Sequence, residues 1–100
     1  MEAMHVMSAL AQPTRLAVFR LLVDALPGGL PAGDIASATG TATSNMSVHL
    51  AILSRAGIVT SEKIGRTVVY SAATGPVRNA ADFLARACAR ASGKEGGTAK

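Results

Sequence analysis

Aromatic residues, cysteine and long apolar runs are scarce in this 100-residue sequence. Its aromatic residues are Phe19, Tyr70 and Phe83, so aliphatic side chains must form the core, and a stacking surface for single-stranded nucleic acid is not expected. The single cysteine excludes an internal disulfide and zinc sites built from paired cysteines. No apolar run reaches the roughly 18 residues of a membrane span, and the N-terminus lacks the basic cluster of a signal peptide. These absences predict a single-domain, cytoplasmic protein with no membrane partner.

Charge is present but unevenly placed. The sequence has 10 Lys and Arg against 6 Asp and Glu, and the formal net charge of +4 permits, without requiring, a polyanionic partner. Between residues 36 and 61 the only charged side chain is that of Arg55, whereas Lys63 and Arg66 closely flank Gly65. Hydrophobic residues make up 49% of the chain, which is enough for a folded core. An uncharged polar stretch therefore precedes a short basic one.

Apolar spacing, together with proline and glycine, predicts four helices in the first half of the chain. The expected ranges are 2–11, 13–26, 31–38 and 42 to about 56. In the first range, the spacing of Met4 and Met7 predicts an apolar side. A threonine, either Thr41 or Thr43, is expected to cap the fourth helix. Gly57 is expected to end that helix in the left-handed conformation.

The second half predicts a β-hairpin followed by a long helix. The β-branched residues at 58–60 and 67–71 surround Gly65, which suits the turn of a hairpin. The helix that begins at Gly75-Pro76 has apolar residues at steps of four and three, the spacing of a helix that packs against a partner helix. These residues are Val77, Ala81, Leu84, Cys88 and Ala91. Residues 1–91 are predicted to form one domain, and residues 92–100 a flexible C-terminal tail.

Helix, tight turn, helix and hairpin follow one another in the order of a winged helix-turn-helix. The predicted fold class is α+β, mainly α, with extra N- and C-terminal dimerisation helices. In such a fold the second helix of the pair enters the major groove, and the hairpin tip reaches the DNA backbone or the minor groove. Pairing through the first and last helices would bury apolar stripes that a chain of this length covers poorly alone. The order of elements therefore predicts a homodimer that binds double-stranded DNA.

Four stretches, PTRLAVFRLL, GDIASATG, SVHLAILSRAGIV and KIGRTVVYS, resemble the ArsR/SmtB family of bacterial transcriptional repressors. The resemblance covers about residues 9–73 and is most specific in the third stretch, which begins at Ser47. It implies a homodimeric repressor that recognises an inverted-repeat operator through residues 42–54 and a basic wing at 63–67. It also implies release by a signal that this sequence does not identify. The alternative is a winged-helix protein-interaction module without specific DNA binding, which an uncharged recognition helix favours.

The candidate DNA-binding residues lie on this helix and on the wing. They are Thr43, Ser44, Asn45, Ser47 and His49 on the helix, and Lys63 and Arg66 on the wing. Asparagine pairs with adenine through two hydrogen bonds, hydroxyls bind bases or phosphates, and a basic wing suits the DNA backbone or a narrow minor groove. Structural roles compete with these functions: helix capping for Thr43 and Ser44, a solvated amide for Asn45, and bracing of the helix for His49.

The metal ligands that the resemblance to this family implies are missing from this sequence. Arsenic- and cadmium-type members of the family place a Cys-x-Cys pair on the third helix, where this chain has LPAGD at residues 30–34. Zinc-type members use Asp and His pairs on the last helix, where residues 76–91 contain Asp82 and no histidine. The sequence therefore predicts neither a metal site nor a cofactor.

Two further functions would depend on single residues. Cys88 is either a packing residue on the apolar side of the last helix or a thiol that senses oxidants and thiophilic agents, and the sequence leaves both open. Catalysis is not expected, because Ser47 and His49 are two positions apart on a helix and point in different directions. No carboxylate lies near them in the sequence.

Overall fold

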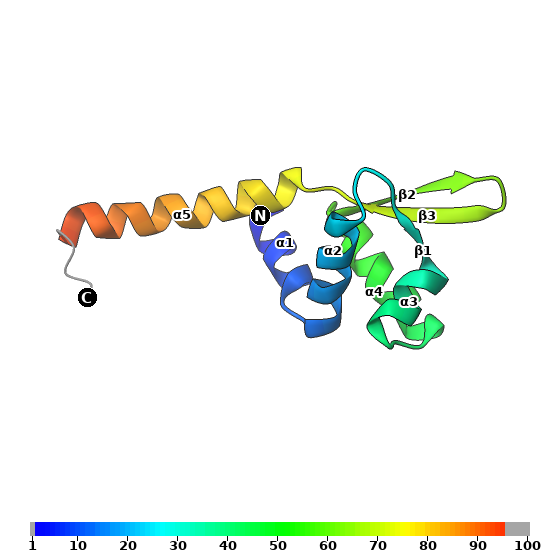
Figure 1. Ribbon diagram of the computed structural model, residues 1–100. Coiled ribbons are helices and arrows are strands. Elements are labelled where there is room, and N and C mark those ends of the chain that lie inside the picture. Colours follow the sequence, from blue (N-terminus) through cyan, green and yellow to red (C-terminus); the bar gives the residue numbers. More distant parts are fainter. Residues whose placement is uncertain (1, 96–100) are drawn as a thin grey trace.

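The computed structural model describes residues 2–95, which form five α-helices and one three-stranded antiparallel sheet (Figure 1). The elements are α1 (Glu2–Leu10), α2 (Pro13–Asp24), β1 (Leu30–Pro31), α3 (Ala32–Thr39), α4 (Thr43–Arg55), β2 (Val59–Ile64), β3 (Thr67–Ala72) and α5 (Gly75–Glu95). Helices α3 and α4 form the helix-turn-helix and β2 and β3 form the wing, which confirms the predicted mainly helical α+β fold. No single helix among the described residues is long and apolar enough to cross a membrane; α1 and α2 reach that length and composition only as a pair bent by 101°.

The core lies where α2, α3 and α4 meet. Val18 and Leu22 of α2, Ile35 of α3, and Leu50 and Leu53 of α4 are at most 2% exposed. On α4 the buried residues recur at steps of four and three, so they share one side of the helix. Burial of this side determines which side of α4 faces the solvent.

The C-terminal end of α4 is closed by backbone hydrogen bonds around a glycine. Gly57 has a φ of 79°, and its N–H donates to the carbonyl of Ser54 at 3.0 Å. The N–H of Ile58 donates to the carbonyl of Leu53 at 3.2 Å, which completes the six-residue closure known as a Schellman motif. The side chains of Leu53 and Ile58 are fully buried, as the motif favours. The predicted left-handed end at Gly57 is confirmed.

The predicted threonine cap at the start of α4 is wrong. The N-cap residue is Ala42, and no side chain hydrogen-bonds the helix start there. Gly40 turns the chain immediately after α3 with a φ of 66°. The hydroxyl of Thr39 then donates to that of Thr41 at 3.1 Å, and the N–H of Thr41 donates to the carbonyl of Ala36 at 3.0 Å. These threonines therefore bind to one another and to the end of α3 instead of capping α4.

A short strand precedes α3, which begins one residue later than the sequence predicts. Leu30–Pro31 form β1 and pair with β3, where Leu30 lies opposite Tyr70. Two residues are too few to show the alternation that marks a strand in a sequence. Next to β1 the chain passes so close to β3 that a Cβ on Gly29 would overlap the carbonyl oxygen of Tyr70 and the hydroxyl of Ser71.

Helix α1 buries Val6 and Ala9 within this chain and leaves the predicted apolar side, with Met4 and Met7, more accessible. Val6 and Ala9 are buried, whereas Met4 is 61% exposed and Met7 is half-buried. The reason is that α1 packs against α2, α4 and α5 at once, and these neighbours cover the side that carries Val6 and Ala9. The end of α1 is held by Arg15, whose Nε donates to the carbonyl of Ala9 at 2.7 Å.

Helix α5 is the longest element and extends away from the rest of the molecule (Figure 1). Its beginning packs against α1, where Ala80 is 4% exposed, but the side chains of residues 81–90 are all exposed. On the predicted apolar stripe, Val77 is half-buried, Leu84 is 45% exposed and Cys88 is exposed. The side chain of Ala91 lies outside the described ones. Within this chain, the stripe therefore faces solvent over most of its length.

The last helix also continues beyond its predicted end. It extends to Glu95, so residues 92–95 are helical where the sequence predicts a flexible tail. Residues 96–100 of that predicted tail lie outside the described residues. Alanine at 91 and the absence of proline after it allow the helix to continue past the last apolar position of the stripe.

We expect Gly29→Ala to lower the free energy of unfolding by about 1–3 kcal/mol, because an added methyl group in this packed position displaces backbone. Gly33→Ala is the matched control, because no atom lies within 4 Å of a Cβ at that position of α3. Alanine there is expected to stabilise the helix by about 0.5–1 kcal/mol. Urea unfolding followed by circular dichroism measures both variants. Equal effects at the two positions would contradict the close approach at Gly29.

Candidate nucleic-acid interface

The side of α4 opposite the core presents small, uncharged side chains. Ser44 and Val48 lie one helical turn apart and point away from the buried Met46 and Leu50. The predicted α4 residues that the structure leaves exposed are Thr43, Ser44, Asn45 and Ser47. Four of the five predicted helix residues are thus accessible at the N-terminal half of α4, the part that enters the major groove in helix-turn-helix proteins.

Val48 is a candidate contact that the sequence reasoning missed. Its side chain is 59% exposed in the centre of the outward side of α4. An apolar residue in an amphipathic helix is ordinarily assigned to the core, which explains the omission. Its spacing in the sequence could have identified it. Val48 is four residues from Ser44, on the same side of the helix, and two from each of the buried residues Met46 and Leu50, which lie on the other side. Valine methyl groups in a major groove make apolar contact with the methyl group of thymine.

The structure separates His49 from the exposed residues of α4. His49 is half-buried, and its Nδ1 atom is buried without a hydrogen-bond partner in the described part of the chain. A ring nitrogen placed in this way faces the protein interior, which favours bracing of the helix over reading of a base. Ser47 is exposed, and its hydroxyl donates to the carbonyl of Thr43 at 3.3 Å. The oxygen of Ser47 keeps lone pairs with which to accept a hydrogen bond.

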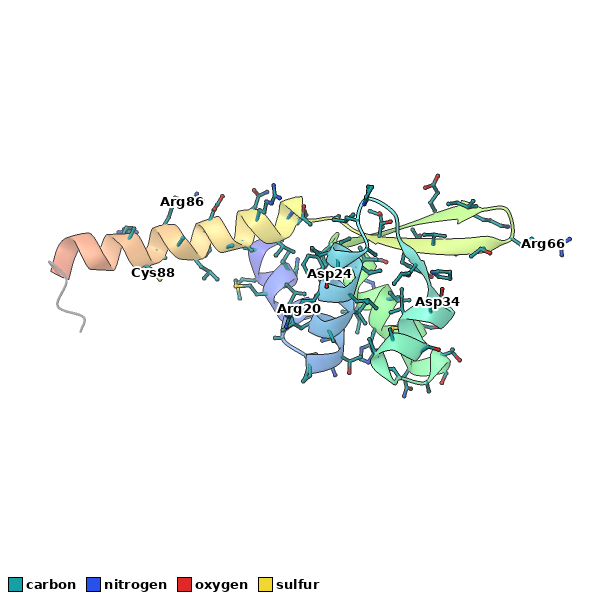
Figure 2. The ribbon with its side chains drawn as sticks, in the orientation of Figure 1. Arg20, Asp24, Asp34, Arg66, Arg86 and Cys88 are labelled. Carbon is teal, nitrogen blue, oxygen red and sulfur yellow. The ribbon has the colours of Figure 1, made fainter. Side chains whose placement is uncertain are left out.

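The wing is a two-stranded hairpin with a basic tip. Gly65, with a φ of 64°, makes the turn, and the side chain of Arg66 extends from it into solvent (Figure 2). Lys63 is exposed and lies opposite Val68 in the strand pairing. Successive side chains of a strand point to opposite faces, so the carboxylate of Glu62 lies on the other face from Lys63. One face of the wing and its tip are therefore basic without a neighbouring acid.

The two predicted DNA-binding elements lie at one end of the molecule. Figure 1 shows the wing and the α3–α4 pair on one side of α2 and the free end of α5 on the other. This arrangement places α4 and the wing at the same end of the molecule.

The described residues contain no group of three or more His, Cys, Asp and Glu side chains that could hold a metal ion. Cys88 lies on the free part of α5, at the other end of the molecule from Arg66 (Figure 2). The thiol therefore has no direct contact with the wing.

Comparisons with known proteins agree with this geometry. A family model described as a helix-turn-helix domain matches residues 10–62, which is just over half of the chain. The fold matches that of an ArsR-like transcriptional regulator from a Rhodococcus species with a TM-score of 0.82 and 25% identity, covering 95% of this chain and 87% of that one. The chain belongs to the ArsR family of winged helix-turn-helix regulators.

Two further known proteins are similar to this chain. A possible ArsR-family regulator from Mycobacterium bovis, solved as a homodimeric winged helix-turn-helix DNA-binding domain, matches with a TM-score of 0.70 and 26% identity, covering 91% of this chain and 82% of that one. The HTH-type transcriptional regulator NmtR of Mycobacterium tuberculosis is 38% identical over 65 residues, which are 65% of this chain and 52% of that protein. The chain thus spans about half the length of this curated relative. Membership of the ArsR family confirms the resemblance that the sequence carries.

We expect Lys63→Ala and Arg66→Ala each to weaken binding to any double-stranded DNA and to lower the salt dependence of the binding constant by about one unit, because each cation replaces a counterion on the phosphates. Arg86→Ala is the matched control, since Arg86 lies on α5 far from the wing (Figure 2). Fluorescence anisotropy of a labelled duplex at several salt concentrations measures the slope. If the salt dependence of DNA binding keeps the parent value in both wing variants, the wing does not contact DNA.

Proposed function

We propose that this ArsR-family chain is a homodimeric transcriptional repressor that binds an inverted-repeat operator through the N-terminal half of α4 and the basic tip of the wing. One observation carries the proposal: an exposed, uncharged polar helix surface shares one end of the molecule with a basic hairpin tip. The two surfaces suit different tasks, because base contacts specify a sequence whereas phosphate contacts position the protein. The proposed role is binding in the cytoplasm, without a catalytic step.

The outward side of α4 provides groups that read bases. Asn45 is exposed and has the amide geometry for two hydrogen bonds with adenine. Ser44 and Val48 lie at the centre of this side, where a hydroxyl and an isopropyl group would meet base edges and thymine methyl groups. Thr43 begins the helix, and the unpaired backbone N–H groups of the first turn favour a phosphate there. We assign His49 to bracing of α4 because its Nδ1 atom is buried.

The wing provides the sequence-independent part of the affinity. Lys63 and Arg66 are exposed, and no acidic residue shares the face of Lys63. An arginine at a wing tip reaches phosphates and fits a narrow minor groove, in which the negative potential is enhanced.

Dimerisation through α1 and α5 explains why so much of α5 is exposed. An isolated helix of about 15 residues is marginally stable in water, so the free part of α5 needs a partner surface. Phe83 and Leu84 are 40% and 45% exposed there, and Met4 of α1 is 61% exposed. Two-fold pairing with a second copy would cover these side chains and place two α4 helices for the two halves of an inverted repeat. The relative from Mycobacterium bovis was solved as a homodimer, which supports pairing of two copies.

The proposal includes release of the operator by an effector signal. Cys88 stays a hypothesis for a thiol sensor, because its exposed position on α5 fits both oxidation and packing in the proposed dimer. The second candidate function is a protein-interaction module, which the exposed Val48 and the lack of charge on the outward side of α4 favour. The salt dependence distinguishes them, because an apolar docking surface responds little to ionic strength.

We expect Asn45→Ala to cost about 1–3 kcal/mol on the operator and to relax the base preference at one position of each half-site, as loss of a bidentate contact does. Asn79→Ala on α5 is the matched control, because Asn79 is exposed and distant in sequence from α4. Competition between operator variants measures the preference. A loss of affinity that is uniform over all sequences would mean that Asn45 positions the helix and does not read a base.

We expect Leu84→Asp to yield a monomer with weak operator binding, because a buried unpaired carboxylate opposes the proposed pairing and a single half-site binds weakly. Ala89→Asp introduces the same charge on the same helix, but away from the predicted stripe, and is expected to remain dimeric. Sedimentation and anisotropy measure the two properties. An intact Leu84→Asp dimer with parental DNA affinity would show that the stripe containing Leu84 is not the dimer interface.

A further inference from the structure

A groove between α1 and α4 has no role in the DNA contacts described above. Its volume is about 270 Å³, and its lining comes from His5, Ser8 and Ala9 of α1 and from Ile52, Arg55 and Ala56 of α4. The two walls are more than 40 positions apart in the sequence, and only the packing of α1 against α4 brings them together.

The polar groups of this groove are hydrogen-bond donors with a positive charge among them. His5 and Ser8 are three positions apart, so they share one side of α1. Arg55 lies in the last turn of α4, on the opposite wall. No acidic side chain lines the groove, so the guanidinium of Arg55 has no carboxylate partner in the lining. A planar guanidinium in this setting matches the two oxygens of a carboxylate.

The remaining lining is apolar. Ala9 is buried, and Ile52 and Ala56 are half-buried next to it. A predominantly apolar surface with a few convergent polar groups is the usual composition of a small-molecule site. The volume of about 270 Å³ lies just below the range of about 300–1,000 Å³ for such sites, which suits a molecule with a single ring.

We propose that this groove binds a small organic anion, a carboxylate on a compact apolar body, and that this ligand regulates operator binding. The carboxylate binds the guanidinium of Arg55 and accepts hydrogen bonds from Ser8 and His5, while the apolar body covers Ala9 and Ile52. The regulatory part rests on the proposed function as a DNA-binding repressor. Binding of the organic anion does not depend on that proposed function and is argued from the groove alone.

The position of the groove explains how a ligand in it would affect DNA binding. Helix α1 packs against α5, which projects for pairing, and also against α4, which carries the DNA-reading residues. A ligand that bridges Arg55 to His5 and Ser8 binds more tightly to one placement of α1 relative to α4 than to others. Differential affinity of this kind shifts the equilibrium between conformations. Coupling between two sites in proteins commonly changes affinity by about 5- to 150-fold.

A second groove supplies the matched control. It lies between α2 and α3, has a volume of about 500 Å³ and contains Arg20 and Asp24. These two residues are one turn apart on α2, so a carboxylate near Arg20 would also meet the negative charge of Asp24. An arginine is therefore available in each groove, but only Arg55 lies in a lining without an acid.

The binding experiment titrates benzoate into the full-length, ¹⁵N-labelled protein and follows amide chemical shifts. We expect shifts around His5, Ser8 and Arg55 with a dissociation constant on the order of 1 mM, as suits nine heavy atoms. Arg55→Gln should weaken binding about tenfold, whereas Arg20→Gln should leave it unchanged. Benzamide, which lacks the charge, and inorganic phosphate, which lacks the apolar body, should each bind much more weakly than benzoate.

Equal benzoate affinity of the parent and the Arg55→Gln variant would overturn the proposed site. Phosphate binding as tight as that of benzoate would overturn the assignment to an organic anion. Arg55 is exposed, so Arg55→Gln is expected to keep the parental circular dichroism spectrum. Ser8→Ala is a second, milder variant, expected to weaken benzoate binding about threefold through loss of one neutral hydrogen bond.

The regulatory experiment measures operator binding by anisotropy with and without saturating benzoate. We expect the operator dissociation constant of the parent to change at least about fivefold, and that of Arg55→Gln to stay constant. Without benzoate the two proteins should bind the operator equally, because Arg55 is not among the DNA contacts. Benzoate binding that depends on Arg55 but leaves operator affinity unchanged would overturn the regulatory part. Failure of the parent to bind any DNA would instead refute the proposed function. The titration of chemical shifts would still test whether the groove binds benzoate.

Discussion

Burial of one side of α4 is the constraint on which the rest of this structure depends. Met46, Leu50 and Leu53 are each at most 2% exposed and belong to the core that α4 shares with α2 and α3. Since removing such a side chain from water stabilises a protein by about 1.5–3 kcal/mol, α4 cannot rotate about its axis without losing several of these contributions. The outward side is therefore as well defined as the inward one, although its residues make few contacts. Rigid presentation of small polar groups is what recognition of base edges requires.

The surfaces proposed for DNA binding and for pairing lie at opposite ends of the molecule. The α3–α4 pair and the wing occupy one end, and α5 projects from the other, with α1 packed at the base of α5 (Figure 1). The exposed part of α5 is thus remote from the surface proposed to read DNA. Helix α1 packs against both α4 and α5, so it connects the exposed helix with the helix proposed to read DNA. The groove that contains Arg55 lies at this junction.

Local patterns predicted much of the architecture because short-range physics determines them. Gly57 ends α4 because only a residue without a Cβ enters the left-handed conformation at low cost, and Gly65 turns the wing for the same reason. The exposure of Thr43, Ser44, Asn45 and Ser47 follows from the helical period once the apolar side is known. The prediction of a threonine cap was wrong because the turn at Gly40 places the hydroxyl of Thr41 beside that of Thr39. The two hydroxyls hydrogen-bond to each other, and Thr41 does not cap α4.

The sequence by itself determined the order of the elements, the helix-turn-helix with its wing, the family and most of the polar surface of α4. Only the tertiary structure decided that Val6 and Ala9, and not Met4, form the buried side of α1, and that Val48 faces outward. It alone paired Leu30–Pro31 with β3 and set His5 and Ser8 opposite Arg55. The physical reason is the distance along the chain: periodicity and turn chemistry act over a few residues, whereas these placements depend on neighbours that packing brings from tens of residues away.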